Sequence, residues 1–222
     1  MGASPRDHAE TNVQLYRQLE RQGYALEAIV LARRAYEAAS RSFAGRLQTS
    51  GRPFLCHLVG TASILAHVGR APAVVAAGLV HSVYRGVDTS DGADLPGSPR
   101  ARLADAVGAD VEAHAFRASR TRRDYAAHRA PLERDDAARR APLDPADRDA
   151  LAILLADELE KLASHNVLYG ARADEKLARV RRKGADMIGL ARALDLPALA
   201  DELAARLDEV GRTTVPPALR GA

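Results

Sequence analysis

Residues 72–84 read PAVVAAGLVHSVY, and this stretch decides the fold class. Every position between Pro72 and His81 is apolar or glycine. A helix that is apolar on all sides must be buried by other elements, and proline suits the first turn of a helix because that position needs no backbone N–H. The stretch therefore predicts a buried central helix that starts at Pro72 and that Gly86 closes.

Helical patterns dominate the rest of the chain as well. Hydrophobic residues make up 47% of the sequence but aromatic residues only 4%, and there is no Trp. A core built mainly from Ala, Leu and Val suits closely packed helices and argues against an all-β barrel or sandwich. We expect an all-α bundle of about eight or nine helices. Apolar periodicity and Gly or Pro boundaries place them near residues 15–22, 26–43, 53–68, 72–85, 98–107, 111–119, 144–168, 173–194 and 197–210.

The length of 222 residues suits a single domain with short additions at its ends. We expect an N-terminal helix over residues 1–24, a helical core over residues 25–170, and C-terminal helices with a tail over residues 171–222. Within the core, residues 120–143 are rich in Arg and Asp and contain two prolines, which predicts an irregular excursion.

Charge and composition limit the classes of partner. The chain has 32 Lys and Arg against 29 Asp and Glu, a formal net charge of +3, which is a weak field for 222 residues. We therefore expect the Arg clusters, Arg122 among them, to be solvated, and we do not expect nucleic acid as a partner. Binding of nucleic acid through the Arg-rich segment 117–140 is the alternative, and it predicts a steep salt dependence.

The sequence also indicates in which cellular compartment the protein is located. No apolar run reaches the 18 or so residues of a membrane span, so we expect none. The N-terminal residues lack the apolar segment of a secretory signal. The single cysteine, Cys56, excludes an internal disulfide and suits a reducing compartment. We expect a cytoplasmic protein.

Three polar residues interrupt apolar helix faces. His57 follows Phe54 by about one turn, His81 ends the apolar stretch that opens at Pro72, and Asp157 follows a strongly apolar run. A single histidine on an apolar stripe is more often a hydrogen-bonded core residue than a ligand. Two histidines on consecutive buried helices, with an inward carboxylate on a third, are nevertheless a suitable donor set for one divalent metal ion, Zn²⁺, Fe²⁺ or Mn²⁺. Their spacing is not a local metal-binding signature.

A family resemblance rests on the same part of the chain. An SGxP turn lies at Ser50–Pro53, a helix with His57 follows it, and a VAAALLHD-like helix covers Val75–Ser82. A later helix carries Asp157 in the place of an ADRLHN-like motif. In order and distance these motifs resemble the HD superfamily, especially the hydrolase domain of the RelA/SpoT (ppGpp) enzymes.

The resemblance covers residues 25–90 and, more loosely, residues 150–170. It implies an HD-like helical bundle in which His57, His81 and Asp157 bind a metal ion. It does not imply ppGpp hydrolysis, because this chain departs from the family at the residues which that reaction uses.

The departures begin at the HD pair, which is His81-Ser82 here, so one aspartate ligand is absent. The acidic pair that follows it in ppGpp hydrolases is replaced by Arg85-Gly86, and the arginine that stacks on guanine falls at Gln48. The general base and the nucleotide clamp of that reaction are therefore not expected in this protein.

The resemblance implies a metal-dependent enzyme that acts on a small molecule, with hydrolysis as the default reaction and iron-dependent oxygenase chemistry as a variant. Ser82 and Tyr84 are expected to line the pocket, and Arg85 to lie at its mouth. The alternative is a metal-free HD-like pseudoenzyme or a protein that binds a ligand or partner. In that case the two histidines are core residues bonded to Asp157 or to backbone carbonyls. The segment over residues 187–209 is rich in Ala and is suited to packing against a second copy of the chain, so the sequence allows a homodimer.

Overall fold

Ten helices make up the regular structure of the residues that the computed structural model describes, which are 8–85, 97–123, 143–169 and 172–214. No strand occurs in these ranges, so the predicted all-α class is confirmed, with slightly more helices than expected. None of the described helices combines the length and the hydrophobicity needed to cross a bilayer. The helices are α1 (Asn12–Arg21), α2 (Leu26–Phe43), α3 (Phe54–His67), α4 (Pro72–Val80), α5 (Pro99–Val107), α6 (Ala109–Arg123), α8 (Pro145–Ala163), α9 (Asn166–Tyr169), α10 (Ala173–Ala193) and α11 (Pro197–Arg212).

Local sequence signals start two helices where the sequence predicts them. Ser98 Oγ accepts a hydrogen bond from the backbone N–H of Ala101 (3.1 Å) at the start of α5. Asp144 Oδ1 accepts one from the N–H of Ala146 (2.9 Å) at the start of α8. A proline follows each cap at the first helical position. These caps satisfy backbone N–H groups that have no partner within the helix.

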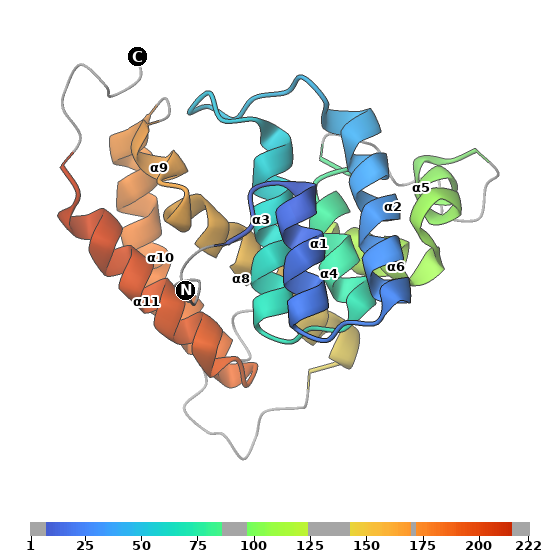
Figure 1. Cartoon of the computed structure of the whole chain (residues 1–222). Helices are drawn as coiled ribbons and strands as arrows, with labels where there is room; N and C mark the ends of the chain where they lie inside the picture. Colours follow the sequence, from blue (N-terminus) through green and yellow to red (C-terminus); the bar gives the residue numbers. More distant parts are fainter. Residues whose placement is uncertain (1–7, 86–96, 124–142, 170–171, 215–222) are drawn as a thin grey trace.

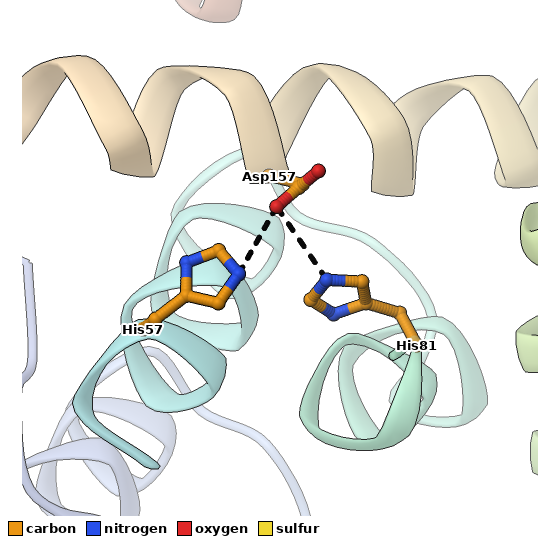
Figure 2. Close-up of side chains that lie close together, drawn as sticks. All are labelled: His57, His81 and Asp157. Atoms are coloured by element: carbon orange, nitrogen blue, oxygen red, sulfur yellow. Dashed lines mark ion pairs between the residues drawn. The ribbon is translucent and has the colours of Figure 1, made fainter. Parts of the chain in front are cut away.

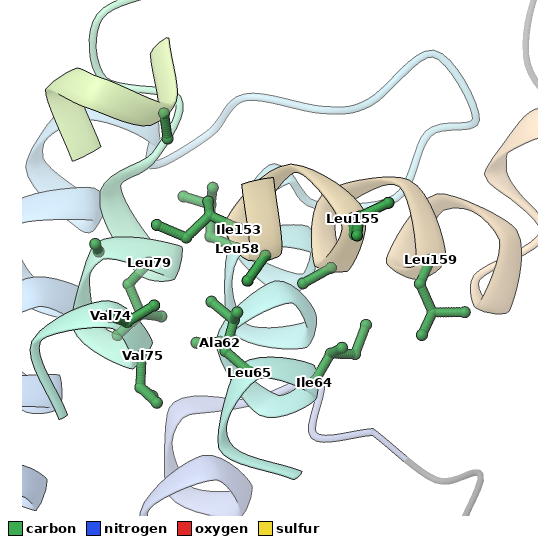
Figure 3. Packing of buried hydrophobic residues seen from close by; sticks show 14 of the residues in the cluster. Leu58, Ala62, Ile64, Leu65, Val74, Val75, Leu79, Ile153, Leu155 and Leu159 are labelled. Carbon is green, nitrogen blue, oxygen red and sulfur yellow. The ribbon is translucent and has the colours of Figure 1, made fainter. Parts of the chain in front are cut away.

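The centre of the bundle consists of α3, α4 and α8. Helix α3 packs against both of the others, and Figure 3 shows their Leu, Ile and Val side chains packed together. Gly78 on α4 permits the close approach to α3, because a Cβ there would lie 2.7 Å from Leu65 Cδ1 and 3.2 Å from Ala62 Cα. Each fully buried apolar side chain stabilises the fold by about 1.5–3 kcal/mol. The three predicted metal ligands lie on these helices or directly after them.

The remaining helices surround this centre as one compact body (Figure 1). Helix α2 packs on α4, and α1 lies across α2 and α3. Helix α6 contacts both α4 and α8, while α10 and α11 pack on each other and α11 packs on α8. The α2 face turned to the interior consists of alanines and of Phe43 at the end of the helix, whereas Leu26 and Val30 on the same helix are 70% and 48% exposed.

Helix α4 ends earlier than the sequence predicts. It stops at Val80, and residues 81–85 form turns. The reason lies in a side chain: His81 Nδ1 donates a hydrogen bond to the Gly78 carbonyl (2.7 Å). In a continuing helix that carbonyl accepts from the backbone N–H of Ser82, so the imidazole competes with helix propagation.

The helix predicted over residues 144–168 is in fact two helices. Helix α8 ends at Ala163, and α9 begins at Asn166. Between them His165 has a φ of +53°, in the left-handed region. Non-glycine residues enter this region at single positions and do not continue a right-handed helix there. The apolar pattern runs on across the break, which is why the sequence does not reveal it.

The irregular excursion predicted over residues 120–143 starts later than expected. Helix α6 continues to Arg123, so residues 120–123 are helical. Residues 124–142, where most of this prediction falls, lie outside the described residues.

Candidate metal centre

The structure brings His57, His81 and Asp157 together at the centre of the bundle (Figure 2). His57 Nε2 lies 3.1 Å from Asp157 Oδ1, and His81 Nε2 lies 3.5 Å from the same oxygen. One ligand atom from each residue lies within 4.8 Å of the other two. All three side chains are at most 3% exposed. Residues up to 100 positions apart in the sequence thus form one buried group, with His57 on α3, His81 directly after α4 and Asp157 on α8.

Both imidazoles are oriented through their Nδ1 atoms. His57 Nδ1 donates to Glu160 Oε2 on α8, and His81 Nδ1 donates to the Gly78 carbonyl. In a neutral imidazole one nitrogen is a donor and the other carries a lone pair. When both imidazoles are neutral, as metal ligands are, the acceptors at Nδ1 therefore leave the two Nε2 lone pairs facing the Asp157 carboxylate.

Two atoms at the point of convergence have no hydrogen-bond partner. These are His81 Nε2 and Asp157 Oδ1, and both are fully buried. A buried polar atom without a partner costs about 1–3 kcal/mol, and here two lone-pair acceptors face each other. A cation between them would remove this cost.

The separations of the two histidines from Asp157 suit a divalent transition metal. Bonds of about 2.1 Å to N and O ligands, at right to tetrahedral angles, separate neighbouring ligand atoms by about 3.0–3.4 Å. The two separations from Asp157 Oδ1, 3.1 and 3.5 Å, are close to that range. Two imidazoles and one carboxylate are donors that suit Zn²⁺, Fe²⁺ and Mn²⁺.

The second oxygen of Asp157 is held by two cations. Arg122 Nη2 lies 2.5 Å and Lys161 Nζ 2.8 Å from Asp157 Oδ2. Burial acts to raise the pKa of Asp157, but Lys161, the two histidines and Arg122 hold the pKa well below its usual range. Asp157 is therefore a carboxylate. Arg122 belongs to one of the Arg clusters; its guanidinium is turned to this acid while 31% of its side chain stays exposed.

The two histidines differ in their electrostatic surroundings. Burial lowers the pKa of His81, because the charged form loses its hydration. Burial opposes the charged form of His57 as well, but the neighbouring carboxylates of Asp157 and Glu160 outweigh this effect and raise the pKa of His57. Without a cation His57 is thus favoured as an imidazolium between two carboxylates, whereas His81 stays neutral.

The three predicted pocket residues lie in the turns after α4. Tyr84 is buried, and its hydroxyl donates to Glu112 Oε1 (2.7 Å) on α6 and is not bonded to the histidines. Burial and Glu112 raise the pKa of Tyr84. Ser82 is buried, and Arg85 is exposed. Catalytic roles for these three residues stay predictions.

Several neighbours of the site lie outside the predicted set of site residues. Glu160 lies three residues after Asp157, a spacing that places both on one face of a helix, so a signal for it existed. Lys161 is likewise one turn from Asp157. Arg122 and Arg52, which pairs with Glu160, come from distant segments. No sequence pattern joins them to this site.

Comparison with known families gives one match. Residues 39–123 match the sequence model of a family described as "Domain of unknown function (DUF6817)". The match covers less than half of the chain; it includes His57 and His81 and ends before Asp157. A comparison with curated proteins finds no match.

Proposed function

We propose that this chain is a metal-dependent enzyme in which His57, His81 and Asp157 hold one divalent ion, Zn²⁺, Fe²⁺ or Mn²⁺. One observation carries the proposal: His81 Nε2 and Asp157 Oδ1 are buried, face each other and have no hydrogen-bond partner. The placement of His57 on α3, His81 directly after α4 and Asp157 on α8 also supports a second part of the proposal, that the chain is a divergent member of the HD superfamily.

The reaction class that we propose is hydrolysis of a small molecule. A cation in such a site polarises a substrate oxygen or lowers the pKa of a bound water. Three protein ligands are the usual number in catalytic zinc sites, which keep a position open for substrate. The same donors serve non-haem iron, so oxygenase chemistry is the variant that the identity of the metal would select.

The residues of the chain have distinct tasks in this proposal. Lys161 and Arg122 keep Asp157 ionised and hold its carboxylate in one orientation. The Gly78 carbonyl holds His81 with Nε2 turned to the centre. Apolar packing of α3, α4 and α8 keeps bulk water from the ligands, which strengthens every charge interaction there.

Elemental analysis of the purified protein without a His-tag tests the proposal. The wild type is expected to carry one equivalent of zinc, iron or manganese per chain, and the His57→Ala/His81→Ala variant none. The matched control is His67→Ala/His114→Ala, which removes two histidines outside the site and should retain the metal. No metal in the wild type after reconstitution, or full occupancy in the first variant, would overturn the proposal.

The second candidate function is a metal-free protein that binds a ligand or a partner. The observation in its favour is His57, whose raised pKa favours an imidazolium between Asp157 and Glu160. Thermal unfolding with a chelator discriminates between the two. Loss of a bound ion lowers Tm by several degrees, because the ion adds RT ln(1 + [L]/Kd) to stability. An unchanged Tm is the result that the metal-free candidate predicts.

A further inference from the structure

We propose that Glu160 is a positioning residue, which holds His57 in the orientation and tautomer that a metal ligand needs. The inference rests on the proposed metal site and names a residue that the predicted ligand set does not contain. Three observations carry it: the contacts of the carboxylate, the space made for it on α3, and its difference from the partner of the other histidine.

The carboxylate of Glu160 has a partner at each oxygen. Oε2 accepts from His57 Nδ1, and Oε1 accepts from Arg52 Nη1. Arg52 Nη2 lies 3.1 Å from Glu10 Oε1 at the surface. The side chains of His57 and Glu160 are each 3% exposed, and that of Arg52 is 18% exposed. The carboxylate therefore cannot rotate without losing a charged partner in a buried place.

Helix α3 makes room for this carboxylate at Gly60. A Cβ at that position would lie 2.7 Å from Glu160 Cγ and 3.3 Å from Glu160 Oε1. Any larger residue would push Glu160 away from His57. A glycine inside a helix is normally unfavourable, so its presence one turn after His57 indicates that this close approach matters.

The chemistry of the pair suits a metal ligand. A carboxylate that accepts the Nδ1 proton fixes the tautomer, orients the ring and makes the distal nitrogen a stronger donor. His81 has only a neutral backbone carbonyl at its Nδ1. The two imidazoles are thus unequal, and the negative charge on Glu160 makes His57 the stronger ligand.

The test measures zinc affinity by competition with a chromogenic chelator, starting from metal-stripped full-length protein. Glu160→Ala is expected to bind Zn²⁺ about 10–100-fold more weakly than the wild type. Glu160→Gln keeps an oxygen acceptor without the charge. Its affinity for zinc should lie between those of Glu160→Ala and the wild type. The matched control is Glu112→Gln, the same change at a buried carboxylate paired with Arg100; its affinity should equal that of the wild type.

Gly60→Ala provides an independent route to the same contact. It should weaken zinc binding by a similar factor in the wild type but have little effect in Glu160→Ala, where the Cγ that it meets is absent. Gly189→Ala is the control, since nothing lies within 4 Å of the added Cβ on α10. Because Gly60→Ala disturbs the same contact from the side of α3, the test stays decisive if one Glu160 variant folds poorly.

A spectroscopic measurement separates positioning from a general loss of stability. In the zinc-loaded wild type, ¹⁵N spectra of the histidines should show His57 with zinc at Nε2 and a slowly exchanging proton at Nδ1. Glu160→Ala should lose the protected Nδ1 proton, and Glu160→Gln should recover part of it.

The outcomes distinguish this inference from the proposed function. Zinc binding by the wild type with unchanged affinity in both Glu160 variants and in Gly60→Ala would overturn the positioning role alone. Absence of zinc binding in the wild type would overturn the metal site and the positioning role together.

Discussion

Two buried polar clusters lie in this bundle, and they are satisfied in different ways. In the first, Glu112 Oε1 accepts from Tyr84 (2.7 Å) and from Arg100 Nε (2.6 Å), and Oε2 accepts from Arg100 Nη2 (2.7 Å). The Arg100 guanidinium also lies 3.7 Å over the Phe116 ring. Both oxygens of the buried carboxylate are used, so this cluster needs nothing besides the protein.

The second cluster, His57, His81 and Asp157, is equally buried but leaves two atoms at its centre without partners. Its outer atoms are fully engaged, by Glu160, Gly78, Lys161 and Arg122. Burial and charge are common to both clusters, so they do not by themselves mark a candidate site. Unsatisfied atoms that converge at one point do, since a purely structural network would satisfy them.

The largest expected effect is that of Asp157→Asn. The substitution removes one ligand and leaves Arg122 and Lys161 without the carboxylate that they share, so we expect loss of metal binding and a fall in unfolding free energy of about 2–3 kcal/mol. Urea unfolding in the presence of a chelator measures the second effect without the contribution of the metal. Unchanged stability there would mean that the pair with Arg122 contributes nothing.

Glu112→Gln should affect stability but not metal. It removes the charge that pairs with Arg100, and we expect a loss of about 1–2 kcal/mol in urea unfolding. Metal content should equal that of the wild type. A variant that lost metal would contradict the separation of the two clusters.

The raised pKa of Tyr84 predicts a dependence of stability on alkaline pH. The folded protein keeps this proton where the unfolded chain, with a tyrosine pKa of about 10, loses it. The stabilisation is therefore complete below about pH 10 and falls by about 1.4 kcal/mol per pH unit above it. Tyr84→Phe should show a shallower decline between pH 10 and 11, and parallel curves for the two proteins would be inconsistent with this cause.

The smallest effect is expected outside both clusters. Leu26 is 70% exposed on α2, so Leu26→Ser should change the unfolding free energy by less than about 0.5 kcal/mol and leave metal binding intact. A larger destabilisation would show that this surface is covered in solution, and sedimentation of the wild type would then reveal an oligomer.

The sequence predicts the bundle better than the surroundings of its site. Helix starts with local signals, such as Ser98 and Asp144, lie where expected, and three inward polar residues on apolar faces meet as predicted. The end of α4 at Val80 depends on a hydrogen bond of the His81 side chain, and the break at His165 on one backbone angle. Neither feature changes the spacing of apolar residues along the sequence.

The charged neighbours of the site are likewise only partly predictable from the sequence. Glu160 is within one turn of Asp157, so helix geometry points to it. Arg122 and Arg52 reach the site only through tertiary packing of α6 and of the segment before α3. Their positions in Arg-rich or loop-like sequence are typical of solvated residues, and only the fold distinguishes them.

The most direct test of the account is calorimetric titration of Zn²⁺ into metal-stripped wild type, Asp157→Asn and Glu112→Gln proteins. The account predicts one equivalent bound by the wild type and by Glu112→Gln, and none by Asp157→Asn. Binding that is absent from all three proteins, or equal in all three, would contradict it.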